Sequence, residues 1–124
     1  MTLDATLGFD LVSLEAETAY GRVRIDDRHL QPQNVVHGGI YSALAESIAS
    51  HATGEAVHGQ GLVALGMSND ASFFRPISTG VVHGRAELLH RGRTTWVWHV
   101  RLTDDDGRLC AAARVTVAVR PRPG

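Results

Sequence analysis

The feature that most constrains the fold of this chain is a single convincing helix among segments that alternate like strands. Residues 38–53, GGIYSALAESIASHAT, combine helix-favouring alanine and leucine with apolar side chains that recur on one side. That side is made of Ile40, Leu44, Ile48 and His51. Gly54 predicts the end of the helix. One helix is too few for a fold that alternates parallel strands with helical crossovers.

Segments with the pattern of strands fill most of the remaining chain. Trp96 and Trp98 alternate with Val97 and His99, which predicts that the two indoles face the core. The turns HRGR and DDDGR carry the glycine and aspartate that tight hairpins require, and residues 29–36 are predicted as a loop. Two strands precede the helix and four follow it, at residues 9–15, 18–26, 62–74, 80–90, 94–103 and 109–119. This order predicts an α+β fold in which one long central helix is wrapped by a mostly antiparallel sheet of about five to six strands.

Length and composition indicate one globular unit. The 124 residues, 44% hydrophobic and 20% charged, are predicted to form a single domain over 1–124, with a short flexible tail from about residue 120. A formal net charge of -1 argues against a nucleic-acid or membrane partner, although all 12 basic residues are arginines, which suit phosphate groups. Cys110 is the only cysteine, so no internal disulfide is expected. The first ten residues lack a signal-peptide pattern and no apolar run has transmembrane length, so we expect a cytoplasmic protein.

The side of the helix outside the apolar stripe carries Glu46, with the hydroxyl of Ser50 one turn later. An exposed glutamate on a solvated face is the ordinary alternative. Three features favour a functional carboxylate instead. The neighbouring residues are small, no lysine or arginine lies three or four positions away, and the helix opens with Gly38 and Gly39. Two glycines at this point are costly unless something must approach the backbone closely.

The start of the helix is a second candidate for chemistry, because free amides at a helix N-terminus can polarise a carbonyl oxygen. Glu46 lies eight residues beyond Gly38, about 12 Å along the axis at 1.5 Å per residue, which a glutamate side chain cannot span. If both groups act on one substrate, Glu46 comes from a second subunit whose helix runs antiparallel to the first. The sequence therefore predicts a two-fold dimer.

The segment QPQNVVHGGIYSALAESIAS resembles the signature of hotdog-fold acyl-CoA thioesterases. The resemblance is closest to the branch that contains 4-hydroxybenzoyl-CoA thioesterase, the phenylacetate-pathway thioesterases, and the aryl-CoA thioesterases of menaquinone and enterobactin biosynthesis. It continues through SNDASFFRP, HRGRTT and DDGRLCAAARVTVAV, and so covers nearly the whole chain. It implies an enzyme that hydrolyses an aryl- or arylacetyl-CoA, such as 4-hydroxybenzoyl-CoA, to the free acid and CoA.

The resemblance also implies roles for individual residues. Glu46 is the catalytic carboxylate, acting as nucleophile or general base, while the Gly38 N–H and the Gln31 side chain polarise the thioester carbonyl. Ser50 orients the water, and His37 shapes the helix entrance. The residues expected to contact CoA are Arg75, Arg93, Thr94, Thr95 and Arg120. No cofactor is implied beyond the CoA of the substrate, and the related enzymes are tetramers, built as dimers of dimers, with sites at the dimer seam.

Two other functions fit the same fold. A hydratase or dehydratase would use a His-containing acid–base pair, for which His37 is the candidate. A non-catalytic acyl-CoA binding protein is the other alternative. The seven histidines lack the spacing of metal ligands, so we expect no metal site. Phe73 and Phe74 are predicted on opposite faces of their strand, so at most one of them would line an acyl pocket.

Overall fold

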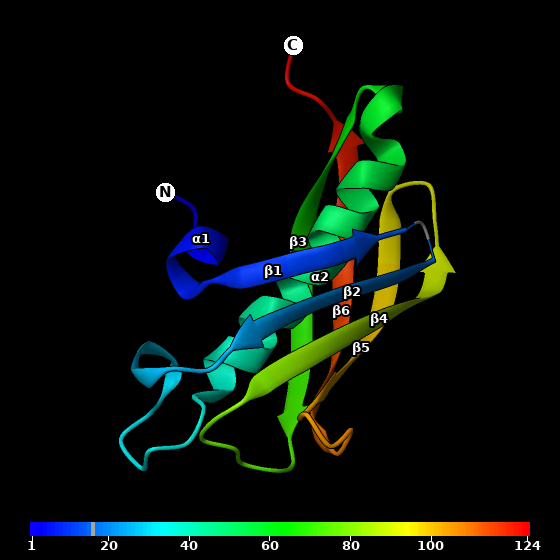
Figure 1. Cartoon of the computed structure of the whole chain (residues 1–124). Helices are drawn as coiled ribbons and strands as arrows, with labels where there is room; N and C mark the ends of the chain where they lie inside the picture. Colours follow the sequence, from blue (N-terminus) through cyan, green and yellow to red (C-terminus); the bar gives the residue numbers. More distant parts are fainter. Residues whose placement is uncertain (16) are drawn as a thin grey trace.

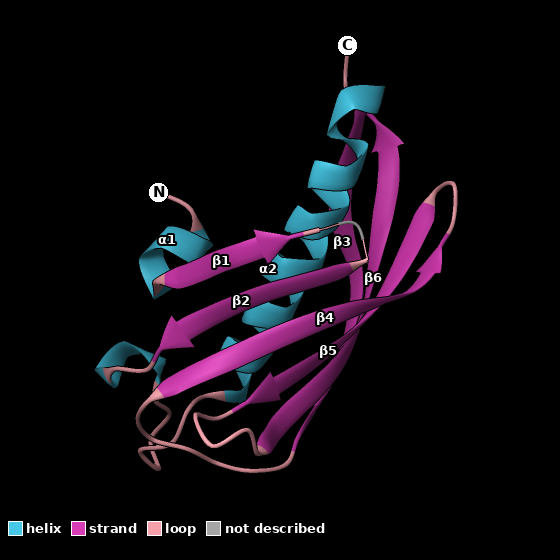
Figure 2. Ribbon diagram, turned by 45° about the vertical axis from the view of Figure 1, so that its right-hand side comes forward, coloured by secondary structure: helices cyan, strands magenta, loops and turns pink. Residues whose placement is uncertain are grey.

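One antiparallel sheet curls around one long helix (Figure 1, Figure 2). The structure is a computed structural model that describes residues 1–15 and 17–124. Its helices are α1 (Leu3–Leu7) and α2 (Gly38–Val57), with short 3-10 helices η1 (Asp27–His29) and η2 (His58–Gln60). Its strands are β1 (Phe9–Leu14), β2 (Thr18–Arg24), β3 (Leu62–Phe73), β4 (Val81–Arg91), β5 (Thr95–Thr103) and β6 (Leu109–Pro121).

The strand order is β1-β2-β4-β5-β6-β3, and each neighbouring pair is antiparallel. A long helix wrapped by six antiparallel strands is the hotdog fold, so the predicted fold class is confirmed. The order places β1 and β3 at the two edges. With 12 residues, β3 is the longer edge, and within the described part of the chain its only strand partner is β6.

The core lies between α2 and the inner face of the sheet. Leu44 and Ile48 are fully buried, and so is Trp98, as its alternation predicted. The Trp98 indole N–H donates to the Thr53 hydroxyl over 2.9 Å, which ties β5 to the helix. A Cβ on Gly84 of β4 would lie 2.6 Å from the Cδ1 of Ile48, so the sheet backbone itself contacts the helix at this point.

The helix is longer than predicted. The sequence placed its end at Gly54, but α2 continues to Val57, which is 3% exposed. Gly54 keeps a helical backbone, and a Cβ there would meet only the Cβ of Ala64, at 3.8 Å. The left-handed glycine that ends this region is Gly61, after η2. The prediction also put His51 on the apolar side, but its side chain is 55% exposed and pairs with a carboxylate near the N-terminus.

Two further differences concern the ends of the chain. The five-residue helix α1 has no counterpart in the sequence prediction, since it buries no residue and begins at a local cap in which Ala5 N–H donates to Thr2 Oγ1 over 3.1 Å. At the other end, Pro121 still pairs with Leu62, and Arg122 N–H donates to the Gly61 carbonyl over 2.8 Å. The pairing of β6 therefore reaches past residue 120, where a flexible tail was expected to begin.

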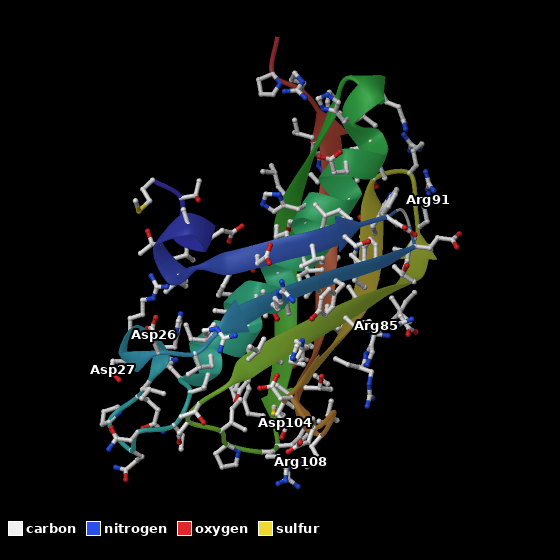
Figure 3. The ribbon with its side chains drawn as sticks, in the orientation of Figure 1. Asp26, Asp27, Arg85, Arg91, Asp104 and Arg108 are labelled. Carbon is white, nitrogen blue, oxygen red and sulfur yellow. The ribbon has the colours of Figure 1, made fainter. Side chains whose placement is uncertain are left out.

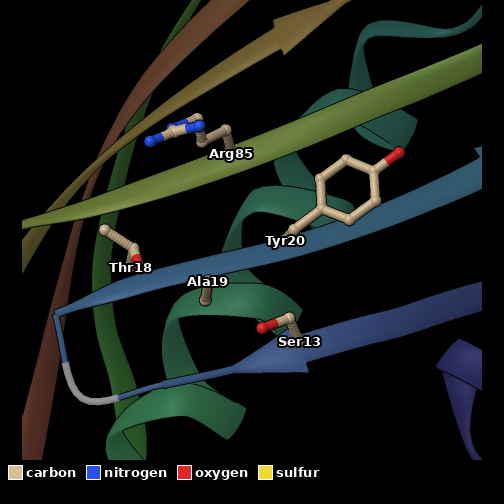
Figure 4. A pocket seen from close by; sticks show the side chains of 5 residues that line it. All are labelled: Ser13, Thr18, Ala19, Tyr20 and Arg85. Carbon is tan, nitrogen blue, oxygen red and sulfur yellow. The ribbon is translucent and has the colours of Figure 1, made fainter.

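The sheet face turned away from α2 is polar. Figure 4 shows Tyr20 and Arg85 standing on this face, while Ala19 points toward the helix. A small hollow of about 150 Å³ lies here, lined by Ser13, Thr18, Ala19, Tyr20 and Arg85. None of the residues that the sequence singled out for chemistry lines it. Among the described residues, no helix has both the length and the apolar character needed to cross a bilayer.

Candidate active site

The start of α2 is built by His37 and the two glycines that follow it. His37 is the N-cap residue, and its Nδ1 accepts a hydrogen bond from Gly39 N–H over 2.8 Å. The Gly38 N–H has no acceptor among the described residues, as expected for a first-turn amide. The ring of Phe73 lies so close that a Cβ on Gly38 would be 2.6 Å from it. The two glycines are thus explained by close approach, one to Phe73 and one to the capping imidazole.

A pocket of about 250 Å³ opens beside Gly38, and we call it the Gly38 pocket. Its lining residues are Gln31, Val35, Val36, Gly38, Tyr41, Phe73, Phe74, Arg75 and Pro76. The Gln31 backbone turns tightly, because its N–H donates to the Val35 carbonyl over 2.8 Å. The Gln31 side-chain oxygen accepts from the N–H of Gln33, which leaves the side-chain NH₂ group as the donor available to a ligand. Both predicted polarising groups, in Gly38 and Gln31, therefore share one pocket with Arg75.

Both phenylalanines line the Gly38 pocket, so the prediction that they lie on opposite faces is wrong. The alternation of faces holds only within a strand, and β3 ends at Phe73. Phe74 lies beyond that end, where its N–H donates to the Cys110 carbonyl over 2.7 Å. The regular alternation of faces therefore does not extend to Phe74.

Tyr41 is a pocket residue that the sequence did not single out. It is 3% exposed, and its hydroxyl has no hydrogen-bond partner among the described residues. Burial raises the pKa of Tyr41 to about 12, and the Cys110 thiol and the Asp104 carboxylate add to the effect. Burial also raises the pKa of the Cys110 thiol. Both shifts favour the neutral form of these groups.

Glu46 lies in a second pocket, of about 370 Å³, which we call the Glu46 pocket. Its lining residues are Thr2, Leu3, Asp4, Glu46, Ser47, Ser50, His51, Ala64, Leu65 and Gly66. The carboxylate rests against Gly66 of β3, where a Cβ would be 2.9 Å from Glu46 Oε2. Glu46 forms no ion pair with any described residue. The Ser50 Oγ is buried and, within the described chain, also lacks a hydrogen-bond partner.

One chain does not bring the predicted residues together. Gln31, Gly38 and Arg75 line the first pocket, whereas Glu46 and Ser50 line the second. The remaining predicted CoA contacts, which are Arg93, Thr94, Thr95 and Arg120, line neither pocket.

These four residues gather at the far end of β3. The Arg120 guanidinium donates to the Thr94 carbonyl over 2.8 Å, and Arg120 pairs with Val63. Ten residues of β3 separate Val63 from Phe73, about 34 Å at 3.4 Å per residue. In Figure 3, Arg91 at the end of β4 lies at the upper right and Arg108 at the bottom, so the β4–β5 and β5–β6 turns lie at opposite ends of these strands.

Comparison with known proteins identifies the class of this chain. Residues 33–111, well over half of the sequence, match the thioesterase superfamily. The chain belongs to that family and is a thioester hydrolase with the hotdog fold.

Several relatives align with this chain over most of their own length. A Mycobacterium tuberculosis protein named as an esterase is 41% identical over 114 residues, which is 90% of this chain and 81% of that protein. Its solved structure gives a TM-score of 0.92 at 37% identity, covering 98% of both chains. The 1,4-dihydroxy-2-naphthoyl-CoA hydrolase of Listeria monocytogenes is 30% identical over 122 residues, 98% of each chain.

A third relative is a Staphylococcus aureus protein, named as a thioesterase enzyme, that was solved as two single-site mutants. One mutant replaces a glutamate by alanine, with a TM-score of 0.92 at 28% identity, covering 97% of this chain and 99% of that one. The other replaces a glutamine by alanine, with a TM-score of 0.91 at 27% identity, covering 96% and 98%.

Proposed function

We propose that this chain hydrolyses an acyl-CoA thioester with Glu46 as the catalytic carboxylate. The observation that carries the proposal is that Glu46 lies against Gly66 in one pocket with the Ser50 hydroxyl, and that neither side chain has a polar partner among the described residues. In the proposed reaction, Glu46 attacks the thioester carbonyl or removes a proton from a water that Ser50 orients. The Gly38 N–H and the Gln31 amide stabilise the negative charge that develops on the carbonyl oxygen. A thiolate is a good leaving group, so polarisation and a modest base suffice.

The mutants of the Staphylococcus aureus relative support the pairing of these two residues. The glutamate and the glutamine replaced there are fifteen positions apart in that protein's numbering. Gln31 and Glu46 have the same separation in this chain (46 − 31 = 15). The spacing supports assigning the two roles to this glutamine and this glutamate.

The separation of the two pockets supports a site shared by two chains. Strand β3 is an unpaired edge with exposed apolar side chains at Leu65 and Met67, which favours pairing with a second β3. An antiparallel pair about a two-fold axis near Asn69, between Gly66 and Phe73, would bring the Glu46 pocket of one chain to the Gly38 pocket of the other. The same pairing would bring Arg93, Thr94, Thr95 and Arg120 of one chain toward Arg75 of its partner. We further propose that two such dimers form a tetramer, which light scattering would measure.

An aryl or arylacetyl group is the proposed acyl part, with 4-hydroxybenzoyl-CoA as an example. Phe73 and Phe74 supply flat apolar surface beside Gly38, at the side of the proposed two-chain site that would meet the Glu46 pocket of the other chain. The Listeria monocytogenes relative, named for an aryl-CoA substrate, supports the same class. His37 is already engaged as a helix cap, which disfavours the hydratase alternative that needs it as a proton carrier.

A thiol-release assay on a panel of acyl-CoA esters tests the proposed function. The wild type should release CoA fastest from aryl esters. Glu46→Ala should lower kcat by about three orders of magnitude or more, because a principal acid–base or nucleophilic group is lost. Circular dichroism and CoA binding should stay close to wild type, since Glu46 is exposed. A variant that kept a tenth of the activity would make this carboxylate structural and the mechanism wrong.

A further inference from the structure

Two side-chain contacts of Asp4 hold helix α1 against α2 beside the Glu46 pocket. The Ser47 hydroxyl donates to Asp4 Oδ1 over 2.5 Å, and His51 Nε2 lies 3.3 Å from Asp4 Oδ2. Ser47 and His51 stand one and five residues after Glu46, so one carboxylate of α1 holds two points of the catalytic helix. The Asp4 side chain is 24% exposed, less than either Asp10 or Asp26 in its ion pair.

The fastened helix forms one wall of the Glu46 pocket. Thr2, Leu3 and Asp4 all line it, and Leu3 keeps an apolar side chain that is 61% exposed. The apolar side chains of Ala64 and Leu65 line the same pocket. An exposed leucine that shares a pocket with two apolar side chains offers a surface that an apolar ligand group would cover.

The charges in the two pockets distinguish the two parts of an acyl-CoA. The Glu46 pocket is lined by the carboxylates of Asp4 and Glu46, which disfavour the phosphates of CoA. The residues expected to contact CoA lie outside this pocket, and Arg120 is paired with Val63 beyond its edge. Arg75 lines the Gly38 pocket instead. In the proposed two-chain site, the thioester would lie where the Glu46 pocket of one chain meets the Gly38 pocket of the other, so the acyl group would be the part directed toward α1.

We infer that α1 closes the acyl-binding end of the Glu46 pocket, that Leu3 limits the size of the acyl group, and that Asp4 is the positioning residue that holds α1 in place. This inference rests on the proposed thioesterase function and assigns its specificity. A purely structural role for Asp4 would change stability, and would change the rates with all esters alike.

The test compares kcat/KM for benzoyl-CoA and the bulkier 1-naphthoyl-CoA, measured by thiol release. Leu3→Trp should lower the naphthoyl-to-benzoyl ratio roughly tenfold, since small changes of pocket volume have effects of this order. Leu3→Ala and Asp4→Ala should raise the ratio, because the first shortens the wall and the second releases it. Asp4→Asn should stay nearer to wild type, since its amide oxygen still accepts from Ser47.

Asp10→Ala is the matched control, because it removes the ion pair with Arg22, 3.2 Å long, outside the Glu46 pocket. It should leave the ratio unchanged. An active wild type whose ratio moves in neither Leu3→Trp nor Asp4→Ala would overturn this inference alone. A wild type inactive on every ester would overturn the proposed function and this inference with it.

Discussion

Gln31 and Arg75 line the same pocket, but they differ in the part of the substrate that they would contact. The oxygen that Gln31 would bind gains charge only in the transition state, so Gln31→Ala should lower kcat by roughly 10- to 1000-fold with little change in KM. Phosphate contacts are alike in the ground and transition states, so Arg75→Ala should raise KM and nearly preserve kcat. Steady-state kinetics of both variants would measure this division.

A substrate shortened to the pantetheine arm provides the control for these two variants. The effect of Arg75→Ala should vanish with it, because the nucleotide phosphates are gone, whereas the effect of Gln31→Ala should remain. Equal losses for both variants on both substrates would contradict the roles assigned to the two residues.

Gly66 is the residue whose hydrogen atom leaves room for the Glu46 carboxylate, the proposed catalytic group. A Cβ at this position would be 2.9 Å from Glu46 Oε2, and the free end of that side chain would have to move. Gly66→Ala should therefore fold normally but lower kcat by roughly ten- to a hundredfold, the effect of a misplaced catalytic group. Gly54→Ala is the matched control, because its Cβ would make only an ordinary contact of 3.8 Å with Ala64. Equal kcat values for the two variants would show that Glu46 does not depend on this contact.

At the scale of the elements, the turn between β5 and β6 depends on two carboxylates. The Arg108 backbone N–H, which donates to Asp104 over 2.9 Å, holds the pKa of this carboxyl below its ordinary value, and the Arg108 guanidinium adds to the effect. The pKa of Asp105 is lowered first by its hydrogen bond from the His83 ring, 2.8 Å long. Figure 3 shows Asp104 and Arg108 side by side at this turn.

Both folded-state pKa values lie below the unfolded values, near 3.9. The stabilisation is therefore complete above the unfolded pKa and is lost as the pH falls through the folded pKa values. The free energy of unfolding should decline below about pH 4. The double variant with Asp104→Asn and Asp105→Asn should have a clearly lower free energy of unfolding than the wild type at pH 7. At pH 3 the difference from the wild type should be smaller. Urea unfolding at the two pH values measures this, and an equal difference at both would contradict the linkage.

The helices and strands differ in how well the sequence predicts them. Helix α2 and the six strands could be predicted because each has a regular alternation of apolar and polar residues. The extension of α2 beyond Gly54 could not, since burial of Val57 outweighs the roughly 1 kcal/mol that a glycine costs inside a helix. Helix α1 has no apolar stripe and depends on the contact of Asp4 with α2, which only the folded chain creates.

The candidate site was predictable to a similar extent. Glu46 and Ser50 could be found because they interrupt the apolar pattern of a helix, and Gly38 because it opens that helix. Only the family resemblance supplied Gln31. The sequence did not indicate Tyr41, because tyrosine is common near the start of a helix. Only the structure shows that its hydroxyl is buried and has no hydrogen-bond partner among the described residues. Gly66 gave a weak indication in the sequence, since a glycine inside a strand often marks a close approach.

At the scale of the whole molecule, the central claim is that one active site takes residues from two chains. Gln31 and Glu46 line different pockets of one chain, and β3 is left as an unpaired edge. The proposed two-fold pairing of β3 gives each dimer two sites, and each site combines Glu46 of one chain with Gln31 and Gly38 of the other. An active monomer in light scattering would already argue against this arrangement.

Mixing two impaired variants tests the claim most directly. Glu46→Ala and Gln31→Ala are unfolded together, refolded as an equal mixture, and assayed for thiol release from an aryl-CoA. In a hybrid dimer one site receives both substitutions and the other receives neither. Half of the dimers are hybrids by random pairing, so the mixture should recover about one quarter of the wild-type kcat per chain, well above the mean of the separately refolded variants. Activity equal to that mean would contradict the account, because it would place Gln31 and Glu46 of the same chain in one site.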